Sequence, residues 1–245
     1  MILASAQTKP HRFDIEKNLA DHYRFIDIAA KHKVDFIAFP ELSITGYERD
    51  RAHELAFQKG DKRLDGLKEL AAKHNMIIVA GAPVIAGEEM HIGSFVLFPN
   101  GKTEIYTKQF LHGDEKNFYS PSCSYNPLIE EYGERIKLAI CADIDHPQHA
   151  ENASKMNATI YVPSIFFSPG GLPGAYNDLS GYAGKYSMSV LMSNFCVEAW
   201  GRPSGGKSAF WNCKGELIDN LNDNNPGLLI VEKTGDEIKT WCVYL

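Results

Sequence analysis

Apolar and polar positions follow two different patterns along the chain. Short, nearly continuous apolar runs at residues 2–7, 36–40 and 76–85 are typical of buried β-strands. Between them, residues 14–32 and 61–74 carry apolar side chains at helical spacing, as expected for helices with one buried face. The N-terminal part therefore predicts strands joined by crossover helices, beginning with a βαβ unit.

The rest of the chain continues this alternation and adds hairpins. Residues 94–98 and 103–108 flank Asn100-Gly101, a dipeptide that supplies the positive φ angles of a tight hairpin turn. Further strands are predicted at residues 135–140, 159–164, 190–197, 209–212 and 227–231, helices at 147–156 and 176–188, and an irregular stretch at 110–127. The pattern predicts one α/β domain over residues 1–245, with function carried by loops at strand ends.

Charge and composition limit the partners that fit this chain. A formal net charge of −6 argues against nucleic acid, whose binders gather Lys and Arg on one face. No run reaches the ~18 apolar residues of a membrane span, and no basic segment precedes the first apolar run. The five cysteines form an odd set without paired spacing, which indicates free thiols rather than disulfides or a zinc site. We expect a cytoplasmic protein that acts on small molecules.

Three chemically active side chains stand at the ends of predicted strands: Glu41, Lys108 and Cys141. Each has an ordinary explanation when taken alone, as a loop cap, an edge charge and a small core residue respectively. Amide cleavage, however, requires a thiolate nucleophile, a base that moves protons, and a cation or N–H donor for the developing oxyanion. The three residues together supply these functions.

The segments around these residues resemble, in the same order, the three signature regions of the nitrilase (carbon–nitrogen hydrolase) superfamily. They are Pro40-Glu41-Leu42-Ser43-Ile44-Thr45-Gly46-Tyr47, the stretch at Lys108, and Cys141-Ala142-Asp143, with further likeness at residues 4–7, 193–194 and 205–208. The resemblance implies a four-layer αββα sandwich that assembles into homodimers or larger oligomers. It also implies a site that works without a metal or organic cofactor.

The resemblance further implies a role for each matching residue. Cys141 is the nucleophile that forms a thioester, Glu41 is the base, and Lys108 with the Ala142 backbone N–H binds the oxyanion. A second carboxylate, which orients the lysine and contacts the substrate nitrogen, corresponds to Glu115. Asp114 is the alternative assignment for that carboxylate.

The residues after the nucleophile depart from the superfamily pattern, which commonly has an aromatic residue, then Asp, then Phe-Pro-Glu and finally Arg. Here Ala142 replaces the aromatic residue, His146 the Phe, Gln148 the Glu and Glu151 the Arg. We therefore expect a supporting ion pair and part of the pocket wall to be rebuilt. A Cys141–His146 dyad is an alternative, although the family uses a packing residue at that position.

Several functions compete at this stage. We favour hydrolysis of a small amide over nitrile hydrolysis, because true nitrilases are usually longer and place a tryptophan where this chain has Ala142. An N-carbamoyl amidohydrolase is the nearest enzymatic alternative, and a catalytically silent ligand-binding homologue is the non-enzymatic one. Residues 201–208 spell a phosphate-binding loop, but a strand rather than the required helix is predicted after Ser208.

Overall fold

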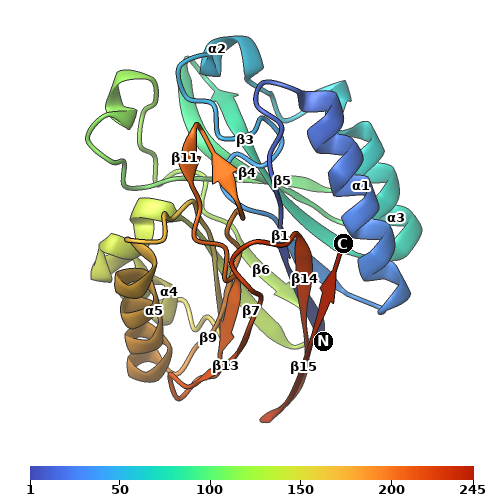
Figure 1. Ribbon diagram of the computed structural model, residues 1–245, viewed down its shortest axis with the longest axis vertical. Coiled ribbons are helices and arrows are strands. Elements are labelled where there is room, and N and C mark those ends of the chain that lie inside the picture. The colour runs from blue at the N-terminus through green and yellow to red at the C-terminus, as the bar shows by residue number, and fades with distance from the viewer.

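A computed structural model describes residues 1–245 and contains two large mixed β-sheets that lie face to face (Figure 1). The first sheet has the order β15 (Glu237–Tyr244), β14 (Gly227–Thr234), β1 (Ile2–Gln7), β2 (Phe36–Ala38), β3 (Ile77–Ala86), β4 (Glu89–Leu97) and β5 (Thr103–Thr107). The second has the order β13 (Leu217–Asn220), β12 (Ala209–Trp211), β9 (Ser189–Met192), β8 (Ile160–Ser164), β7 (Glu134–Ile140) and β6 (Leu128–Glu131). A short hairpin of β10 (Glu198–Ala199) and β11 (Arg202–Pro203) stands outside both sheets.

Helices cover the outer face of each sheet. The helices α1 (Ile15–Lys31) and α3 (Asp65–His74) lie on the seven-stranded sheet, and α4 (Pro147–Lys155) and α5 (Leu172–Tyr186) lie on the six-stranded one (Figure 1). Separate apolar clusters fill the space between the sheets and the space under each helical layer. The fold is therefore the predicted αββα sandwich.

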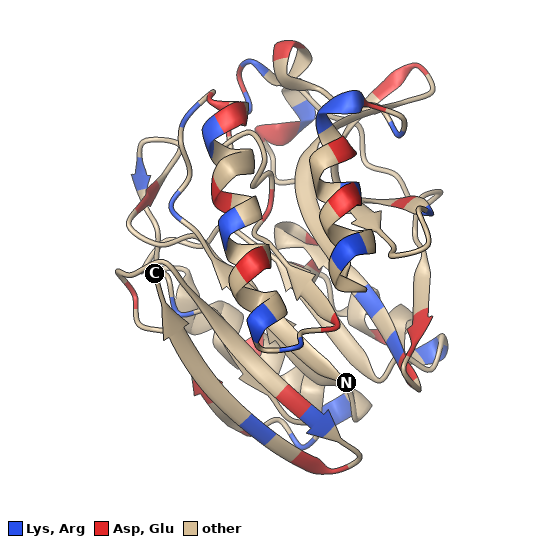
Figure 2. Ribbon diagram, turned by 90° about the vertical axis from the view of Figure 1, so that its right-hand side faces the viewer, with Lys and Arg blue, Asp and Glu red and all other residues tan.

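The sequence explains why α1 forms where it does. The Asp14 side chain accepts a hydrogen bond from the Lys17 backbone N–H at 3.0 Å and so caps the first turn. Leu19, Phe25 and Ile26 belong to its buried stripe. On the outer surface, Figure 2 shows charges of both signs along α1 and α3, so this face offers no extended basic surface. None of the helices is both long and apolar enough to cross a lipid bilayer.

Some element boundaries differ from the prediction. The helix α5 begins at Leu172 rather than at residue 176, because Pro173 fits the first helical turn. Strand β9 ends at Met192 rather than at residue 197, because Ser193 and Asn194 bond to other segments. Residues 62–64 form a 3₁₀ turn before α3.

Strands β6, β13 and β15 were absent from the prediction, and each lies at the edge of a sheet. Their side chains are largely half-buried or exposed, so they carry little of the apolar signal that marks an inner strand. Residues 209–211 form β12, so the segment after Ser208 is a strand, as predicted, and cannot provide the helix of a phosphate-binding loop.

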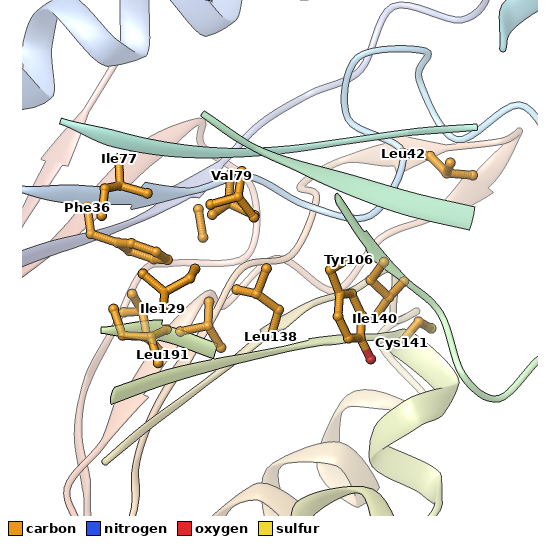
Figure 3. Close-up of a cluster of buried hydrophobic side chains, with 14 of the residues drawn as sticks. Phe36, Leu42, Ile77, Val79, Tyr106, Ile129, Leu138, Ile140, Cys141 and Leu191 are labelled. Carbon is orange, nitrogen blue, oxygen red and sulfur yellow. The ribbon is translucent and has the colours of Figure 1, made fainter. Parts of the chain in front are cut away.

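Polar contacts fasten the two sheets together near the carboxyl ends of their central strands. The Ser5 hydroxyl donates to the Met192 carbonyl at 2.7 Å, and the Ser193 hydroxyl donates to the Ala38 carbonyl at 2.9 Å. Figure 3 shows that Leu42, Tyr106 and Cys141 lie at one end of the apolar core between the sheets. The loops that carry the predicted site residues leave the sheets at that end.

Candidate active site

Glu41 lies in a tight turn after β2 that packs directly on β3. Gly81 permits this approach, because a Cβ there would lie 2.5 Å from the Leu42 backbone nitrogen. The Ile44 N–H donates to the Gly81 carbonyl at 2.9 Å, and Leu42 is held at φ +51°. A non-glycine residue in this region stores about 1 kcal/mol or more of strain. The packed turn holds the fully buried Glu41 side chain in place.

Lys108 follows the last residue of β5 and points into the same buried space. Its backbone N–H donates to the Ile92 carbonyl at 2.8 Å, which fixes the backbone from which the side chain projects. Its Nζ donates to Glu41 Oε1 at 2.8 Å and to Glu115 Oε1 at 2.9 Å. All three side chains are fully buried, so the ammonium has exchanged water for two carboxylates.

Cys141 stands where β7 turns into a 3₁₀ segment, Cys141–Asp145. Its φ is +40°, so the nucleophile candidate occupies a strained backbone position of the kind often found at functional sites. Asp143 holds this turn: Oδ2 accepts the Ile140 N–H at 2.8 Å, and Oδ1 accepts the Gln109 and Phe110 N–H groups at 2.9 and 3.0 Å. The carboxylate thereby ties the Cys141 turn to the chain just after Lys108.

The adjacent acidic residues 114 and 115 take different positions. Glu115 is fully buried and contacts Lys108, whereas Asp114 is exposed and forms a bidentate pair with Arg49 at 2.8 and 3.1 Å. The carboxylate that contacts the lysine is therefore Glu115, and Asp114 is not in that position.

Burial and charge set the proton positions in this cluster. Burial raises the pKa of Glu41 to about 7, although Lys108 opposes the shift. Burial also raises the pKa of Cys141, and Glu41 adds to that shift. For Lys108, burial lowers the pKa, but the charges of Glu41, Cys141 and Glu115 outweigh it and the net shift is upward. Lys108 thus stays an ammonium while Glu41 titrates near neutral pH.

The family comparison agrees with this geometry. The family model for carbon–nitrogen hydrolases matches residues 2–241. The chain belongs to the carbon–nitrogen hydrolase family. Glu41, Lys108 and Cys141 of this hydrolase correspond to the family's Glu-Lys-Cys triad.

Curated relatives match parts of this hydrolase. The glutamine-dependent NAD(+) synthetase of Acinetobacter baylyi is 29% identical over 163 residues, which are 63% of this chain and 29% of that protein. The chain therefore spans less than a third of the length of that synthetase. The 2-oxoglutaramate amidase of Bacillus subtilis is 27% identical over 157 residues, covering 61% of this chain and 60% of that one.

Solved structures show the same fold. The NitN amidase from Nesterenkonia sp. AN1 superimposes with a TM-score of 0.84 at 21% identity, covering 96% of this chain and 93% of that one. A cysteine-to-alanine variant of the Nesterenkonia amidase in complex with butyramide superimposes with a TM-score of 0.85 at 21% identity, covering 96% and 92% of the two chains. These likenesses establish the αββα fold of the hydrolase.

Two polar residues beside the triad were missed by sequence analysis. His112 Nε2 lies 3.5 Å from the Cys141 sulfur, and the hydroxyl of the buried Tyr119 has no hydrogen-bond partner. Both belong to the irregular stretch at residues 110–127, where no periodicity marks which side chains point inward. His146, the residue considered for a dyad, instead stacks on Phe110 with ring centroids 4.0 Å apart and is exposed.

Aromatic side chains form a wall beside the sulfur. The Cys141 thiol lies 3.7 Å from the Phe166 carbonyl oxygen, and the Phe166 ring lies 4.6 Å from that of Tyr47. Trp200 extends the group, and its ring covers the Arg49 guanidinium at 3.8 Å. Tyr47 and Phe166 therefore lie near the candidate nucleophile.

Two of the residues that depart from the superfamily pattern after the nucleophile lie away from the buried site. Gln148 is exposed, and Glu151 is half-exposed and pairs with Lys155 at 2.8 Å, so neither supports the site. The buried support comes from His149, whose ring nitrogens each lie 2.8 Å from a tyrosine hydroxyl, Tyr106 on one side and Tyr161 on the other. No group of three or more His, Cys, Asp or Glu side chains is arranged to hold a metal ion.

Proposed function

We propose that this hydrolase cleaves small, uncharged amides to a carboxylic acid and ammonia through a thioester on Cys141. The observation that carries the proposal is the buried Lys108 ammonium, bonded to both Glu41 and Glu115 beside that thiol. Burying an ammonium between two carboxylates costs desolvation free energy, so such a cluster is better explained by function than by stability. The function that fits this position is stabilisation of an oxyanion next to the nucleophile.

In the acylation step, Glu41 acts as the base. Its Oε1 is bonded to Lys108, while its buried Oε2 has no partner and is free to accept the thiol proton. The sulfur attacks the amide carbon, and the carbonyl oxygen gains negative charge that Lys108 and the Ala142 backbone N–H hold. Glu41 then gives its proton to the nitrogen, the carbon–nitrogen bond breaks, and ammonia leaves.

In the deacylation step, Glu41 acts on water. It removes a proton as the water oxygen attacks the thioester carbon, and Lys108 again holds the oxyanion. The carbon–sulfur bond breaks, the carboxylic acid leaves, and the thiolate recovers a proton from Glu41. The same carboxylate therefore serves both half-reactions.

The aromatic side chains near Cys141 favour a substrate with an uncharged acyl group. Tyr47 and Phe166 offer apolar surface beside the sulfur, and desolvating a charged acyl chain there would be costly. The complex of a Nesterenkonia amidase variant with butyramide adds support for a short acyl amide. Nitriles and N-carbamoyl compounds are the competing substrates.

A substrate panel tests this proposal. Purified enzyme is given butyramide, propionamide, butyronitrile and an N-carbamoyl amino acid, and release of ammonia and carbon dioxide is followed. We expect ammonia from the amides without carbon dioxide, and a loss of at least about 10²-fold in kcat/KM on Glu41→Gln. Cys123→Ser, which alters an exposed thiol, is the matched control and should retain activity.

Three outcomes would contradict the proposal. Carbon dioxide released with ammonia would identify a carbamoyl amidohydrolase, and turnover of the nitrile in preference to the amides would identify a nitrilase. Activity that persists in Cys141→Ala would remove the thioester from the mechanism altogether.

A further inference from the structure

We propose that His112 is an additional catalytic residue, whose Nε2–H donates a hydrogen bond to the Cys141 sulfur whenever that sulfur carries negative charge. The inference rests on the proposed function and deepens it. It assigns to one side chain a task that the triad leaves open, namely direct stabilisation of the thiolate.

The contacts around the sulfur fit this assignment. His112 Nε2 lies 3.5 Å from Cys141 Sγ, and the Phe166 carbonyl oxygen lies 3.7 Å from the same sulfur. A carbonyl can only accept, so the thiol donates its proton in that direction and a sulfur lone pair is left for the imidazole N–H. The sulfur is almost entirely buried, so these protein groups stand in for solvent.

The loop that carries His112 is tied to the triad. The His112 backbone N–H donates to Glu115 Oε2 at 2.9 Å, and the Glu115 N–H donates to the His112 carbonyl at 3.1 Å. Glu115 Oε1 meanwhile accepts from Lys108. The His112 backbone is therefore held by the same carboxylate that contacts the Lys108 ammonium, which fixes the point from which the imidazole reaches the sulfur.

The charge balance of the site creates a need for such a donor. Two cations, Lys108 and Arg49, contact three carboxylates, those of Glu41, Glu115 and Asp114. When Glu41 takes the thiol proton this excess stays the same, but one of the negative charges moves onto the buried sulfur. Burial and the two buried carboxylates accordingly raise the pKa of the thiol. A hydrogen bond from a neighbouring N–H favours the charged form and offsets part of this penalty.

The bond acts twice in each turnover and transfers no proton. It stabilises the thiolate after Glu41 has taken the thiol proton, and again when the carbon–sulfur bond breaks and the thiolate leaves. The charged groups that face His112 are Asp145 from the segment after the nucleophile and Asp114 from its own loop, in addition to Glu115.

The experiment measures the pH midpoint of iodoacetamide labelling of Cys141 by peptide mass spectrometry. The midpoint reports thiolate formation, whereas limited access changes only the overall rate. The variants are His112→Phe, which removes the donor, His112→Gln, which keeps an N–H at a similar reach, and His146→Phe as the matched control. His146 lies close by on Phe110 and has no contact with the sulfur. Amide turnover is measured in parallel.

We expect His112→Phe to raise the Cys141 midpoint by about one pH unit and to lower kcat/KM about tenfold, with the loss mainly in kcat. His112→Gln should stay closer to the wild type, and His146→Phe should match it. The inference is overturned if His112→Phe labels with the wild-type midpoint, or if His112→Gln shifts as far as His112→Phe.

The failure of the inference is distinguishable from the failure of the proposed function. If the wild type hydrolyses amides and His112→Phe has an unchanged midpoint, the triad mechanism stands and only the role of His112 falls. If His112→Phe shifts the midpoint but no amide is hydrolysed, the hydrogen bond stands and the proposed substrate falls.

Discussion

At the scale of single residues, the reaction depends on the proton shared between Glu41 and Cys141. Burial raises the pKa of Glu41 to about 7, and Glu41 can accept the thiol proton only as a carboxylate. We therefore expect kcat/KM for an amide to fall about tenfold per pH unit below pH ~7 and to level off above it. A profile recorded in constant ionic strength buffers between pH 4.5 and 8 tests this. An acidic limb with a midpoint near pH 4.5 would contradict the description of Glu41 as a desolvated base.

The neighbouring carboxylates 114 and 115 offer a second test at this scale. Glu115→Gln keeps the shape of the side chain but removes one of the two charges that hold Lys108. We expect a fall in kcat/KM of about 10²-fold, because the ammonium then meets the oxyanion in a poorer position. Asp114→Asn is the matched control, since Asp114 is exposed and contacts Arg49 instead. Equal losses in the two variants would contradict the assignment of Glu115.

Single residues also show how far the site could be predicted from the sequence. Glu41, Lys108 and Cys141 could be found because each follows an apolar strand, and strand ends are recognisable from periodicity. Glu115 could be assigned only through the family resemblance. His112 and Tyr119 could not be found, because they lie in an irregular stretch whose path depends on tertiary contacts such as the bond from the Phe110 N–H to Asp143.

At the scale of secondary-structure elements, a buried hydrogen-bond network couples β5, the nucleophile turn and α4. The Tyr106 hydroxyl donates to Asp143 Oδ2 at 2.6 Å and lies 2.8 Å from His149 Nε2. Because the Tyr106 hydroxyl has one proton and donates it to Asp143, it accepts a hydrogen bond from His149 Nε2–H. His149 Nδ1 is then unprotonated and accepts from the Tyr161 hydroxyl. This buried hydrogen-bond network thus holds the turn that carries Cys141 in place.

Tyr106→Phe tests this bracing. The substitution leaves the His149 N–H unpaired in a buried place and removes one donor from Asp143, so we expect about 1–3 kcal/mol of lost stability. Urea denaturation followed by circular dichroism measures the change. Tyr125→Phe is the control, because Tyr125 is 37% exposed and its loss of a hydroxyl should be nearly neutral. A Tyr106→Phe variant as stable as the wild type would show that the network contributes nothing to the turn.

The elements that sequence analysis missed share a physical cause. Strands β13 and β15 lie at sheet edges and keep many side chains half-exposed, so apolar periodicity hardly marks them. The start of α5 was hidden in a Gly- and Pro-rich stretch, where Pro173 was read as part of a loop although it occupies the first helical turn. Inner strands such as β1 were predictable to the residue because burial on both faces makes them largely apolar.

At the scale of the whole molecule, the packing of the two sheets against each other holds the triad together. Glu41 and Lys108 leave one sheet and Cys141 leaves the other, so the site exists only while the inter-sheet core is intact. Periodicity alone predicted an α/β protein, and the number of layers came from the family resemblance. Helices covering a sheet look alike in sequence whether one sheet or two lie between them.

Leu138→Ala tests the role of this core. Leu138 is 2% exposed between the sheets, and truncating it should cost about 2–5 kcal/mol through lost burial and an unfilled cavity. Leu217→Ala on the edge strand β13 is the matched control, because Leu217 is 44% exposed. Thermal unfolding should shift markedly for the first variant and little for the second. Similar shifts for both would contradict the central place of the inter-sheet core.

Assembly and cellular location remain predictions for the whole molecule. The family resemblance implies homodimers or larger oligomers, which light scattering of the purified protein would detect. A cytoplasmic location is likewise a prediction, which the free thiols favour.

The most direct test of the central claim is the mass of Cys141 during turnover. Enzyme mixed with butyramide is quenched in acid within the first turnover, digested and analysed for a butyryl thioester, with Cys141→Ala and Cys123→Ser treated in the same way. The account predicts a butyryl adduct on the peptide containing Cys141 in the wild type and in Cys123→Ser, and none in Cys141→Ala. Butyrate formed without any acylated Cys141, or an adduct on another residue, would contradict it.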